Sequence, residues 1–485
     1  MTRIQITTAA PKQPTGEIIP CFAEEVPQEW PQGLFPAKEA ELLVLPSAKS
    51  PPQIFVGLGS RQKLSSGIVR RSILAAVRRA CSIQQKTWLL KWNLPEEYLF
   101  PALTGACEGA YDFDTYKTTK TRTKEITLHL EFTTSVKAEF LRKCLAAVLA
   151  FSRGRTLCCE LANAPGNQLP PLEFARRLRA EVKNLPSITL RVLEEKQLRY
   201  LKMGGILSVG AGSANPPCLI LLHYKPNSNI SPAPAVAKKN RLAPVVLVGK
   251  AITFDSGGIC LKPSESMEEM KFDKSGGSAV AGILIAAAHL SVQREIIGVI
   301  PAAENLPSHT AYRPGDIIKC YDGSTVEIIN TDAEGRLILA DALAFAAKTY
   351  KPSVIIDLAT LTGACVVALG THRAGLFSQN DQLKSTLLQS AEATGELLWP
   401  LPLDEPYYEQ MHSKIATIKN SGGRWGGACT AAAFLSHFVP KGIPWAHIDI
   451  AGVAWNNSDT PHRPVGATGF GVSLLVHWLM TNDCF

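Results

Sequence analysis

Apolar residues in the first part of the chain follow two alternating patterns. Short apolar runs, which are typical of buried strands, lie at 42–45, 53–57, 87–90 and 126–130. Between Ser66 and Ala80, apolar residues instead recur at helical spacing. This alternation predicts a small α/β domain with a largely parallel sheet over residues 1–134.

One helical pattern is longer than the others. It runs from 137 to 165, is broken only near Gly154, and ends in a polar turn at 163–167. Because 485 residues are too many for one hydrophobic core, at least two domains are expected. We therefore interpret residues 135–168 as a helix that links two domains.

Residues 169–485 show the alternation of strands and helices that predicts a larger α/β domain. Strands are predicted at 218–222, 245–248, 296–300, 326–329, 354–356 and 447–450. Helices are predicted at about 277–291, 337–349, 427–438 and 470–480. The fold class is thus α/β: a smaller N-terminal domain is joined by a long helix to a larger C-terminal domain with a mixed, mostly parallel central sheet.

Composition adds limits to this picture. Hydrophobic residues make up 46% and charged residues 19%, as in ordinary globular proteins, and the net charge of +8 only weakly suggests a polyanionic partner. No apolar run approaches the roughly 18 residues of a membrane span, and the start has no signal-like apolar stretch. The 12 cysteines form no CxxC pair. We therefore expect a cytoplasmic protein with reduced thiols, in which any metal site uses oxygen and nitrogen ligands.

Several acidic residues follow predicted strands, where ligands bind in open α/β sheets. The four carboxylates at strand and loop ends are Asp255, Asp273, Asp332 and Glu334. Because Asp332 and Glu334 are two residues apart, an extended backbone would direct both to the same side. Clustered carboxylates repel one another unless cations, such as a pair of divalent metal ions, neutralise them.

Three cationic residues are interspersed among these acids: Lys250, Lys262 and Arg336. The combination suits a hydrolase that binds an oxyanion and positions a water molecule. Spacing alone leaves a structural interpretation equally open. In that interpretation the aspartates are turn or cap residues, and Lys250 is a solvated residue at the end of a strand.

The motifs around these residues resemble those of the cytosol (leucyl) aminopeptidase family. Residues 330–337, Asn-Thr-Asp-Ala-Glu-Gly-Arg-Leu, are similar to its signature octapeptide, and residues 248–258 are similar to its first metal-binding stretch. Further motifs follow in the family's order at 262–263, 270–273, 301–305, 312–316, 357–364 and 467–471. The resemblance covers nearly all of residues 160–485 and is loose before them.

The resemblance implies two divalent metal ions per subunit, either zinc or manganese, with magnesium or cobalt as alternatives. One ion would be held by Asp255, Asp332 and Glu334. The other would be held by Lys250, Asp255, Asp273 and Glu334. A lysine binds metal only as the neutral amine, so the metal must lower its pKa from about 10.4. Substrate-binding residues are implied at Met270, Asn330, Thr360, Leu361, Gly363 and Ala451.

The implied reaction is release of N-terminal amino acids, leucine and other apolar residues above all, from peptides. In the family a water molecule that bridges the metals attacks the scissile carbonyl. Lys262 would stabilise the oxyanion, and Arg336 would hold a bicarbonate ion that moves the proton. The resemblance also implies a homo-hexamer and no membrane partner.

Three positions depart from the family pattern. Lys274 stands where a hydrophobic residue, usually methionine, is common, and Thr417 stands where aspartate is frequent. Ala454 stands where some relatives have a larger pocket residue. These departures concern the substrate preference and the lining of the side-chain pocket rather than the reaction.

Three alternatives to this function are considered. A basic run without acids, which could bind nucleic acid, comprises Arg61, Lys63, Arg70, Arg71, Arg78 and Arg79, and a second comprises Lys117, Lys120, Arg122 and Lys124. Since no aromatic residues interleave with them, we favour a solvated helix face or a surface paired with acids elsewhere in the oligomer. An inactive relative and another metallohydrolase, such as an amidase or a dipeptidase, are the other two. Retention of all seven site residues argues against the inactive relative.

Overall fold

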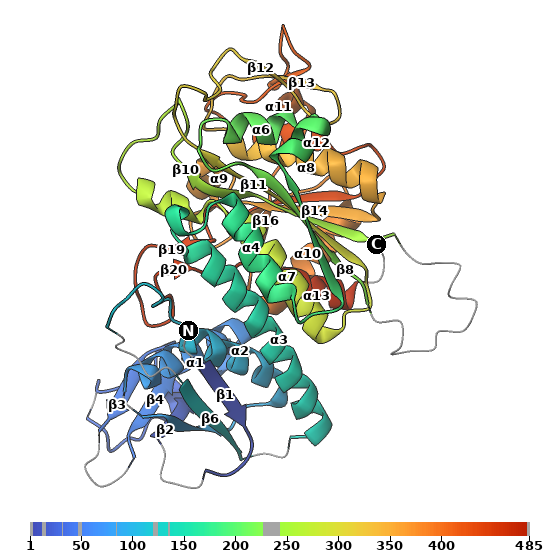
Figure 1. Ribbon diagram of the computed structural model, residues 1–485. Helices are drawn as coiled ribbons and strands as arrows, with labels where there is room; N and C mark the ends of the chain where they lie inside the picture. Colours follow the sequence, from blue (N-terminus) through green and yellow to red (C-terminus); the bar gives the residue numbers. More distant parts are fainter. Residues whose placement is uncertain are drawn as a thin grey trace, which may run out of the picture. The chain divides into compact units, whose positions relative to one another are not determined.

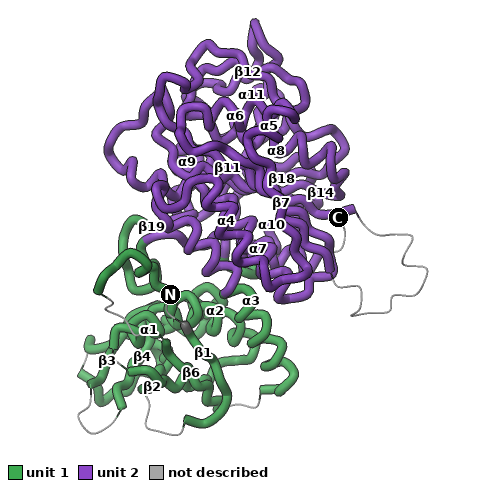
Figure 2. The backbone as a smooth tube through the Cα atoms, in the orientation of Figure 1, with its two compact units in different colours: residues 1–152, 393–395, 456–465 green, residues 153–392, 396–455, 466–485 purple. Residues whose placement is uncertain are grey.

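The computed structural model describes residues 3–11, 16–31, 33–46, 51–83, 85–119, 125–133, 136–226 and 243–482. The chain divides into two units (Figure 2). Unit 1 consists of Met1–Ser152, Ala393–Gly395 and Asn456–Val465, and unit 2 consists of Arg153–Glu392, Glu396–Trp455 and Gly466–Phe485. The long helix expected at 135–168 is α3 (Ala138–Asn163), whose residues are shared between the two units. Two short segments from late in the chain thus belong to unit 1, which periodicity did not indicate.

Unit 1 contains a six-stranded sheet in the order β1-β6-β5-β2-β4-β3. Its strands are β1 (Arg3–Thr7), β2 (Gly16–Cys21), β3 (Leu42–Leu45), β4 (Gln53–Gly57), β5 (Thr87–Trp92) and β6 (Glu125–Phe132). Every pair is parallel except β3 with β4, as the apolar runs predicted. Helices α1 (Ser66–Ser82) and α2 (Leu99–Ala110) pack against each other beside this sheet (Figure 1). Trp88, Leu90 and Trp92 alternate along β5 and form part of the buried core.

The arginines of the basic run have partners within unit 1. Arg70 forms an ion pair with Glu108, and its Nη1 also donates to the backbone oxygen of Thr394 at 2.8 Å. Arg78 forms an ion pair with Asp459. Further ion pairs join Arg71 to Glu39 and Arg61 to Glu25. The basic run is therefore paired with acids rather than merely solvated, and these acids belong to the same chain. In the second run, Lys120, Arg122 and Lys124 lie outside the described residues.

Unit 2 is built on a nine-stranded sheet in the order β16-β15-β18-β14-β9-β11-β8-β7, with β10 paired to β11. The strands are β7 (Ile188–Glu194), β8 (Cys218–Tyr224), β9 (Val245–Gly249), β10 (Ala251–Asp255), β11 (Ile296–Asn305), β14 (Val354–Ala359), β15 (Ala374–Phe377), β16 (Leu398–Pro400) and β18 (Trp445–Asp449). Five of the eight strand pairs are parallel, so the predicted mixed, mostly parallel sheet is confirmed.

Helices cover both faces of this sheet (Figure 1). One layer contains α7 (Ser275–Leu290) and α13 (Val472–Thr481), and the other contains α6 (Gly204–Gly210), α8 (Glu334–Tyr350) and α12 (Gly427–His437). The other helices of unit 2 are α4 (Pro171–Val182), α5 (Glu195–Tyr200), α9 (Gly363–Leu369), α10 (Asp381–Thr394, which ends in unit 1) and α11 (Glu405–Glu409). Central strands such as β9 and β14 are buried along their whole length, which explains their uninterrupted apolar runs. No helix in the described ranges combines the length and hydropathy needed to cross a bilayer.

The strand predicted at 326–329 lies outside the main sheet. It is shortened to β13 (Thr325–Glu327), which pairs with β12 (Ile317–Lys319) and β17 (Ile418–Lys419) in a separate three-stranded sheet. The backbone then turns at 331–332, and α8 begins at Glu334. The expectation that Asp332 and Glu334 share one side of an extended segment is therefore wrong, because a turn and a helix start separate them. An acidic side chain in the first turn of a helix is favoured by the helix dipole.

Candidate metal centre

Three carboxylates come together where elements of unit 2 begin or end. Asp255 is the last residue of β10, Asp273 lies just before α7, and Glu334 is the first residue of α8. All three are buried, and one oxygen of each lies within 4.8 Å of the oxygens of the other two. Asp332, in the turn before α8, has a side chain that is 33% exposed.

Two lysine side chains connect the four carboxylates. The Nζ atom of Lys250 lies 2.7 Å from an oxygen of Asp273 and 2.7 Å from an oxygen of Glu334. The Nζ atom of Lys262 lies 2.9 Å from Asp255 and also contacts Asp332. Four carboxyl groups face two ammonium groups, so acids outnumber cations in the cluster. That excess is what a divalent cation would neutralise.

Burial and charge shift the pKa values of these groups in opposite directions. Burial raises the pKa of Asp255 and Asp273 above the ordinary aspartate value, and it raises the pKa of Asp332 to about 6. Burial also favours the neutral amines of Lys250 and Lys262, but the surrounding carboxylates outweigh it and raise both lysine pKa values. Each lysine is thus a cation in the metal-free cluster, and Lys250 becomes a neutral ligand only where a metal ion replaces its proton.

The residues present fit a metal ion. The second carboxylate oxygen of Asp273 is buried and accepts no hydrogen bond from any described residue, whereas its first oxygen accepts one from Thr360 at 2.7 Å. Buried polar atoms rarely lack a partner, so this oxygen is available as a ligand. Carboxylate oxygens with one amine form a donor set that suits zinc, manganese and related divalent ions.

Gly335 makes room for the lysine in this cluster. A Cβ atom at this position would lie 2.6 Å from Nζ of Lys250, closer than side-chain atoms approach one another. Lys250 also donates to the backbone oxygen of Thr360 at 2.9 Å, which fixes the amine between α8 and the end of β14. The missing side chain of Gly335 therefore sets the position of a predicted metal ligand.

Asp449 connects two loops that carry predicted substrate-binding residues. Its carboxylate accepts hydrogen bonds from the backbone of Leu361 at 3.2 Å and of Ala451 at 3.1 Å, and from the hydroxyl of Thr362 at 2.7 Å. Since β14 and β18 are paired, these loops follow neighbouring strand ends. Gly363 follows in the same loop and begins α9.

The remaining predicted residues lie on the segments beside the cluster. Met270 lies in a 3-10 helix (Met267–Phe272) that ends just before Asp273. Asn330 precedes the turn before α8, and its side chain accepts a hydrogen bond from the backbone of Asp332 at 2.9 Å. Arg336 is buried, donates to the backbone oxygen of Asn420 at 2.8 Å, and has an Nε atom without a partner among the described residues.

Two sequence profiles match this chain. The profile described as the cytosol aminopeptidase family, catalytic domain, matches residues 156–476, and that of the same family's N-terminal domain matches residues 31–120. The chain belongs to the cytosol aminopeptidase family. It is therefore a hydrolase, a metal-dependent aminopeptidase that acts on peptides, as the motifs predicted.

Relatives of this cytosol aminopeptidase are similar over most of their length. The chain is 42% identical over 440 residues to the "Probable cytosol aminopeptidase" of Geotalea uraniireducens (strain Rf4), covering 88% of this chain and 84% of that protein. It is 41% identical over 445 residues to the protein of the same name from Cenarchaeum symbiosum (strain A), covering 90% and 87%.

Solved structures extend the similarity to the fold. A variant of tomato leucine aminopeptidase aligns with a TM-score of 0.87 at 30% identity, covering 99% of this chain and 97% of that one. The bottromycin maturation enzyme BotP in complex with Mn aligns with a TM-score of 0.85 at 32% identity, covering 96% and 99%.

The departures from the family pattern have structural roles in this aminopeptidase. Lys274 is fully buried, its ammonium contacts the backbone oxygen of Lys271, and burial lowers its pKa to about 7. The hydroxyl of Thr417 lies 3.1 Å from that of Thr325, between β17 and β13. Ala454 is buried, and its backbone oxygen accepts a hydrogen bond from Thr468.

Sequence reasoning missed two buried polar residues of this aminopeptidase. Asp449 lies next to the last residue of the strand predicted at 447–450, so the strand-end rule that identified Asp255 could also have found it. Asn420 follows a two-residue strand and precedes Ser421 and two glycines, and that short polar segment carries no comparable signal.

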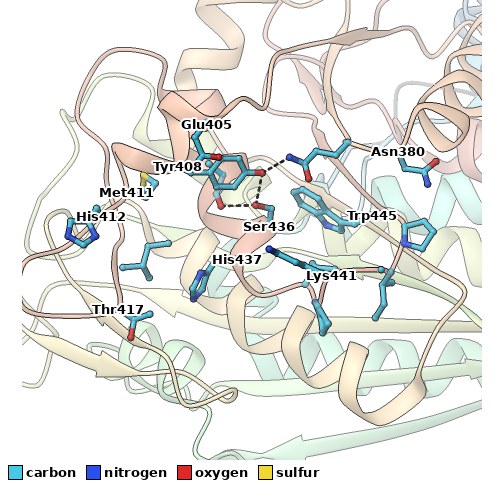
Figure 3. Close-up of a pocket in the computed structure, with 18 residues that line it drawn as sticks. Asn380, Glu405, Tyr408, Met411, His412, Thr417, Ser436, His437, Lys441 and Trp445 are labelled. Carbon is cyan, nitrogen blue, oxygen red and sulfur yellow. Dashed lines mark hydrogen bonds between the residues drawn. The ribbon is translucent and has the colours of Figure 1, made fainter.

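A cavity of about 820 Å³ lies apart from the carboxylates (Figure 3). Figure 3 shows Tyr408 and Ser436 hydrogen-bonded to each other at its wall, and Trp445 lines it as well. Trp445 begins β18 whereas Asp449 ends it, so the cavity lies toward the opposite end of this strand. None of the predicted site residues lines it, so this cavity is separate from the predicted centre.

Proposed function

We propose that this chain releases N-terminal leucine and other apolar residues from peptides, with two divalent metal ions in the carboxylate cluster. Zinc or manganese would suit the donor set best, with magnesium or cobalt as alternatives. One ion would be held by Asp255, Asp332 and Glu334, and the other by Lys250, Asp255, Asp273 and Glu334. The observation that carries this proposal is the buried excess of carboxylates over cations, together with the unpartnered oxygen of Asp273.

When bound, the ions would polarise the scissile carbonyl, lower the pKa of a water molecule and bind the free α-amine of the substrate. Lys262 supplies a fixed positive charge beside them. Its neighbouring carboxylates keep its pKa above the ordinary lysine value, so its ammonium stays protonated and can donate to a developing oxyanion. In the metal-free cluster the same ammonium neutralises Asp255 and Asp332.

Arg336 would hold a bicarbonate ion that receives and passes on the proton. Burial lowers its pKa to about 10, which still leaves the guanidinium charged at neutral pH. Its unpartnered Nε atom is a free donor, and a planar guanidinium matches a planar anion that accepts two hydrogen bonds. Arg336 therefore positions the base and is not the base itself.

The preference for apolar N-terminal residues rests on the walls of the predicted pocket. Met270, Leu361 and Ala451 present apolar side chains, and Asp449 fixes the backbone of two of them. A buried apolar pocket favours a leucine side chain by the area it removes from water.

A cytoplasmic homo-hexamer is proposed from the family resemblance, and the relatives named as cytosol aminopeptidases support the location. Sedimentation of the purified chain would test the assembly, and a monomer at assay concentration would contradict it. The internal pairing of the arginines in unit 1 disfavours the alternative of nucleic-acid binding.

Hydrolysis of leucine-p-nitroanilide tests the proposed reaction. The chain is expected to cleave it, to fail on the N-acetylated form, and to lose activity when metal is removed. Zinc, manganese or cobalt should restore cleavage. Full activity in metal-free protein would contradict the metal-dependent reaction, and equal cleavage of the blocked substrate would favour an amidase.

A further inference from the structure

Asn420 is fully buried, and its backbone and side-chain polar groups form hydrogen bonds with one segment of the chain. Its side-chain oxygen accepts hydrogen bonds from the backbone of Ile329 at 2.7 Å and of Asn330 at 3.2 Å. Its side-chain nitrogen donates to the backbone oxygen of Asn330 at 2.7 Å. Its own backbone nitrogen donates to Glu327 at 2.9 Å, which continues the pairing of β17 with β13.

These bonds lead directly to two predicted site residues. The side chain of Asn330 accepts a hydrogen bond from the backbone of Asp332, so Asn420 fixes the residue that caps the turn carrying this carboxylate. The backbone oxygen of Asn420 accepts the hydrogen bond from Arg336. One residue that follows a two-residue strand thus supports both the turn before α8 and the guanidinium on its first turn.

We propose that Asn420 is a positioning residue, which fixes the positions of Asp332 and Arg336 relative to each other. This inference rests on the proposed function, because it assigns Asp332 to a metal ion and Arg336 to an anion. The segment from β13 to Asp332 is also held at Thr331, whose hydroxyl donates to the backbone oxygen of Gly257 at 2.6 Å and accepts from the backbone of Cys260 at 2.8 Å, but these bonds do not reach Ile329 or Asn330. Without the amide of Asn420, the backbone donors of Ile329 and Asn330 lose their partner, and the backbone oxygen of Asn330 keeps only the hydrogen bond from Ala333 at 3.3 Å.

The test uses Asn420→Ala and Asn420→Asp with Asn380→Ala as the matched control. Asn380 also accepts a backbone hydrogen bond, from Leu383 at 2.8 Å, but at the start of α10 and away from the carboxylates. Asn420→Asp keeps the acceptor for Ile329 and Asn330, loses the donor, and places an ionisable carboxyl group at a buried position. All variants are full-length chains, and their kcat and KM are measured at saturating manganese.

We expect Asn420→Ala to lower kcat by about tenfold to 100-fold, the range for residues that orient metal ligands, while KM changes less than about twofold. Manganese titration should show weakening of one of the two sites, the one that contains Asp332. Asn420→Asp should recover part of the loss, and Asn380→Ala should match the parent. Unchanged kcat in Asn420→Ala, or equal weakening of both sites, would overturn the proposal.

Hydrogen exchange separates this proposal from the proposed function. In metal-free protein, the amides of Ile329 and Asn330 should lose protection in Asn420→Ala and keep it in Asn420→Asp and Asn380→Ala. This measurement needs no catalysis. If the parent binds no metal and cleaves no substrate, the proposed function fails, but hydrogen exchange still reports on the hydrogen bonds made by Asn420. Protection that persists in Asn420→Ala would overturn the positioning role of Asn420 even in an active enzyme.

Discussion

Two regions of this chain concentrate charge, and they differ in how that charge is compensated. Along α1 and the segment before it, four arginines that are close in sequence each form an ion pair with an acid of the same unit. In the strand-end cluster, carboxylates that are distant in sequence outnumber the lysines between them. Paired charges compensate each other, whereas a buried excess of carboxylates must be compensated by protonation or by a further cation. What distinguishes the predicted site from the rest of the fold is how the charges are paired in the structure, not how closely they follow one another in the sequence.

The largest effect is expected from removing a carboxylate of the strand-end cluster. Glu334→Gln removes a carboxylate that would contact both ions, so metal and activity should disappear together. Asp332→Asn should do the same for one ion. Metal content by mass spectrometry and leucine-p-nitroanilide kinetics check both variants. A metal-replete but inactive Glu334→Gln enzyme would show that this residue acts in the chemical step alone.

The next largest effect is expected on the rate of catalysis, with no change in metal content. Lys262→Ala removes a cation, which leaves the carboxylates free to bind ions, but it removes the donor to the oxyanion. A loss of roughly 2.7–4 kcal/mol in transition-state stabilisation is expected, as for an oxyanion-hole donor. Metal content equal to the parent and a reduced kcat would agree with this role. Loss of metal comparable to that in Glu334→Gln would show that Lys262 is misassigned.

Arg70→Ala tests the paired region. Glu108 is buried, so removing its partner should lower the free energy of unfolding by roughly 1–3 kcal/mol while kcat and KM stay near the parent values. Arg71→Ala is the matched control, because the pair of Arg71 with Glu39 is exposed and worth roughly 0–1 kcal/mol. Denaturant unfolding measures both. Equal stability of the two variants would remove the distinction between buried and exposed pairs in this region.

The last effect depends on pH and concerns a buried carboxylate that has no lysine or arginine partner among the described residues. Burial raises the pKa of Asp341 to about 7, while the backbone of Ile206 and Tyr321 donates to it at 2.9 and 2.7 Å. The folded state therefore binds this proton more tightly than the unfolded chain, whose aspartate pKa is about 3.9. Its stabilising contribution is complete below about pH 4 and is lost as pH rises toward 7, at up to roughly 1.4 kcal/mol per pH unit.

Asp341→Asn should flatten this part of the pH dependence. Unfolding free energies of the parent and the variant at pH 5, 6, 7 and 8 give the difference directly. The difference should change between pH 5 and 7 and become constant above. A difference that is the same at every pH would mean that Asp341 keeps an ordinary pKa in the folded protein.

Local pattern predicted most elements of the fold, because each central strand and helix carries its own apolar signal. The helix predicted at 337–349 is α8, which starts three residues earlier at Glu334. Pattern failed at 326–329, where the run Val-Glu-Ile-Ile reads as a strand but a turn follows after Glu327. The acids and lysines of the cluster were found as strand-end residues and as motif members. The pairing of Lys250 with Glu334, and the support from Asn420 and Asp449, depend on contacts between residues 84 to 88 positions apart, which no local pattern encodes.

The late segment that completes unit 1 has a consequence for synthesis. Asp459, the partner of Arg78, leaves the ribosome about 300 residues after Ser152. At usual rates of translation that interval is roughly 15–60 s. Throughout it, the nascent N-terminal unit lacks its last segment, so the chain is expected to depend on chaperones or on a partly ordered intermediate until translation is nearly complete. A fragment that stops at residue 152 should accordingly fold less stably than the same residues do within the complete chain.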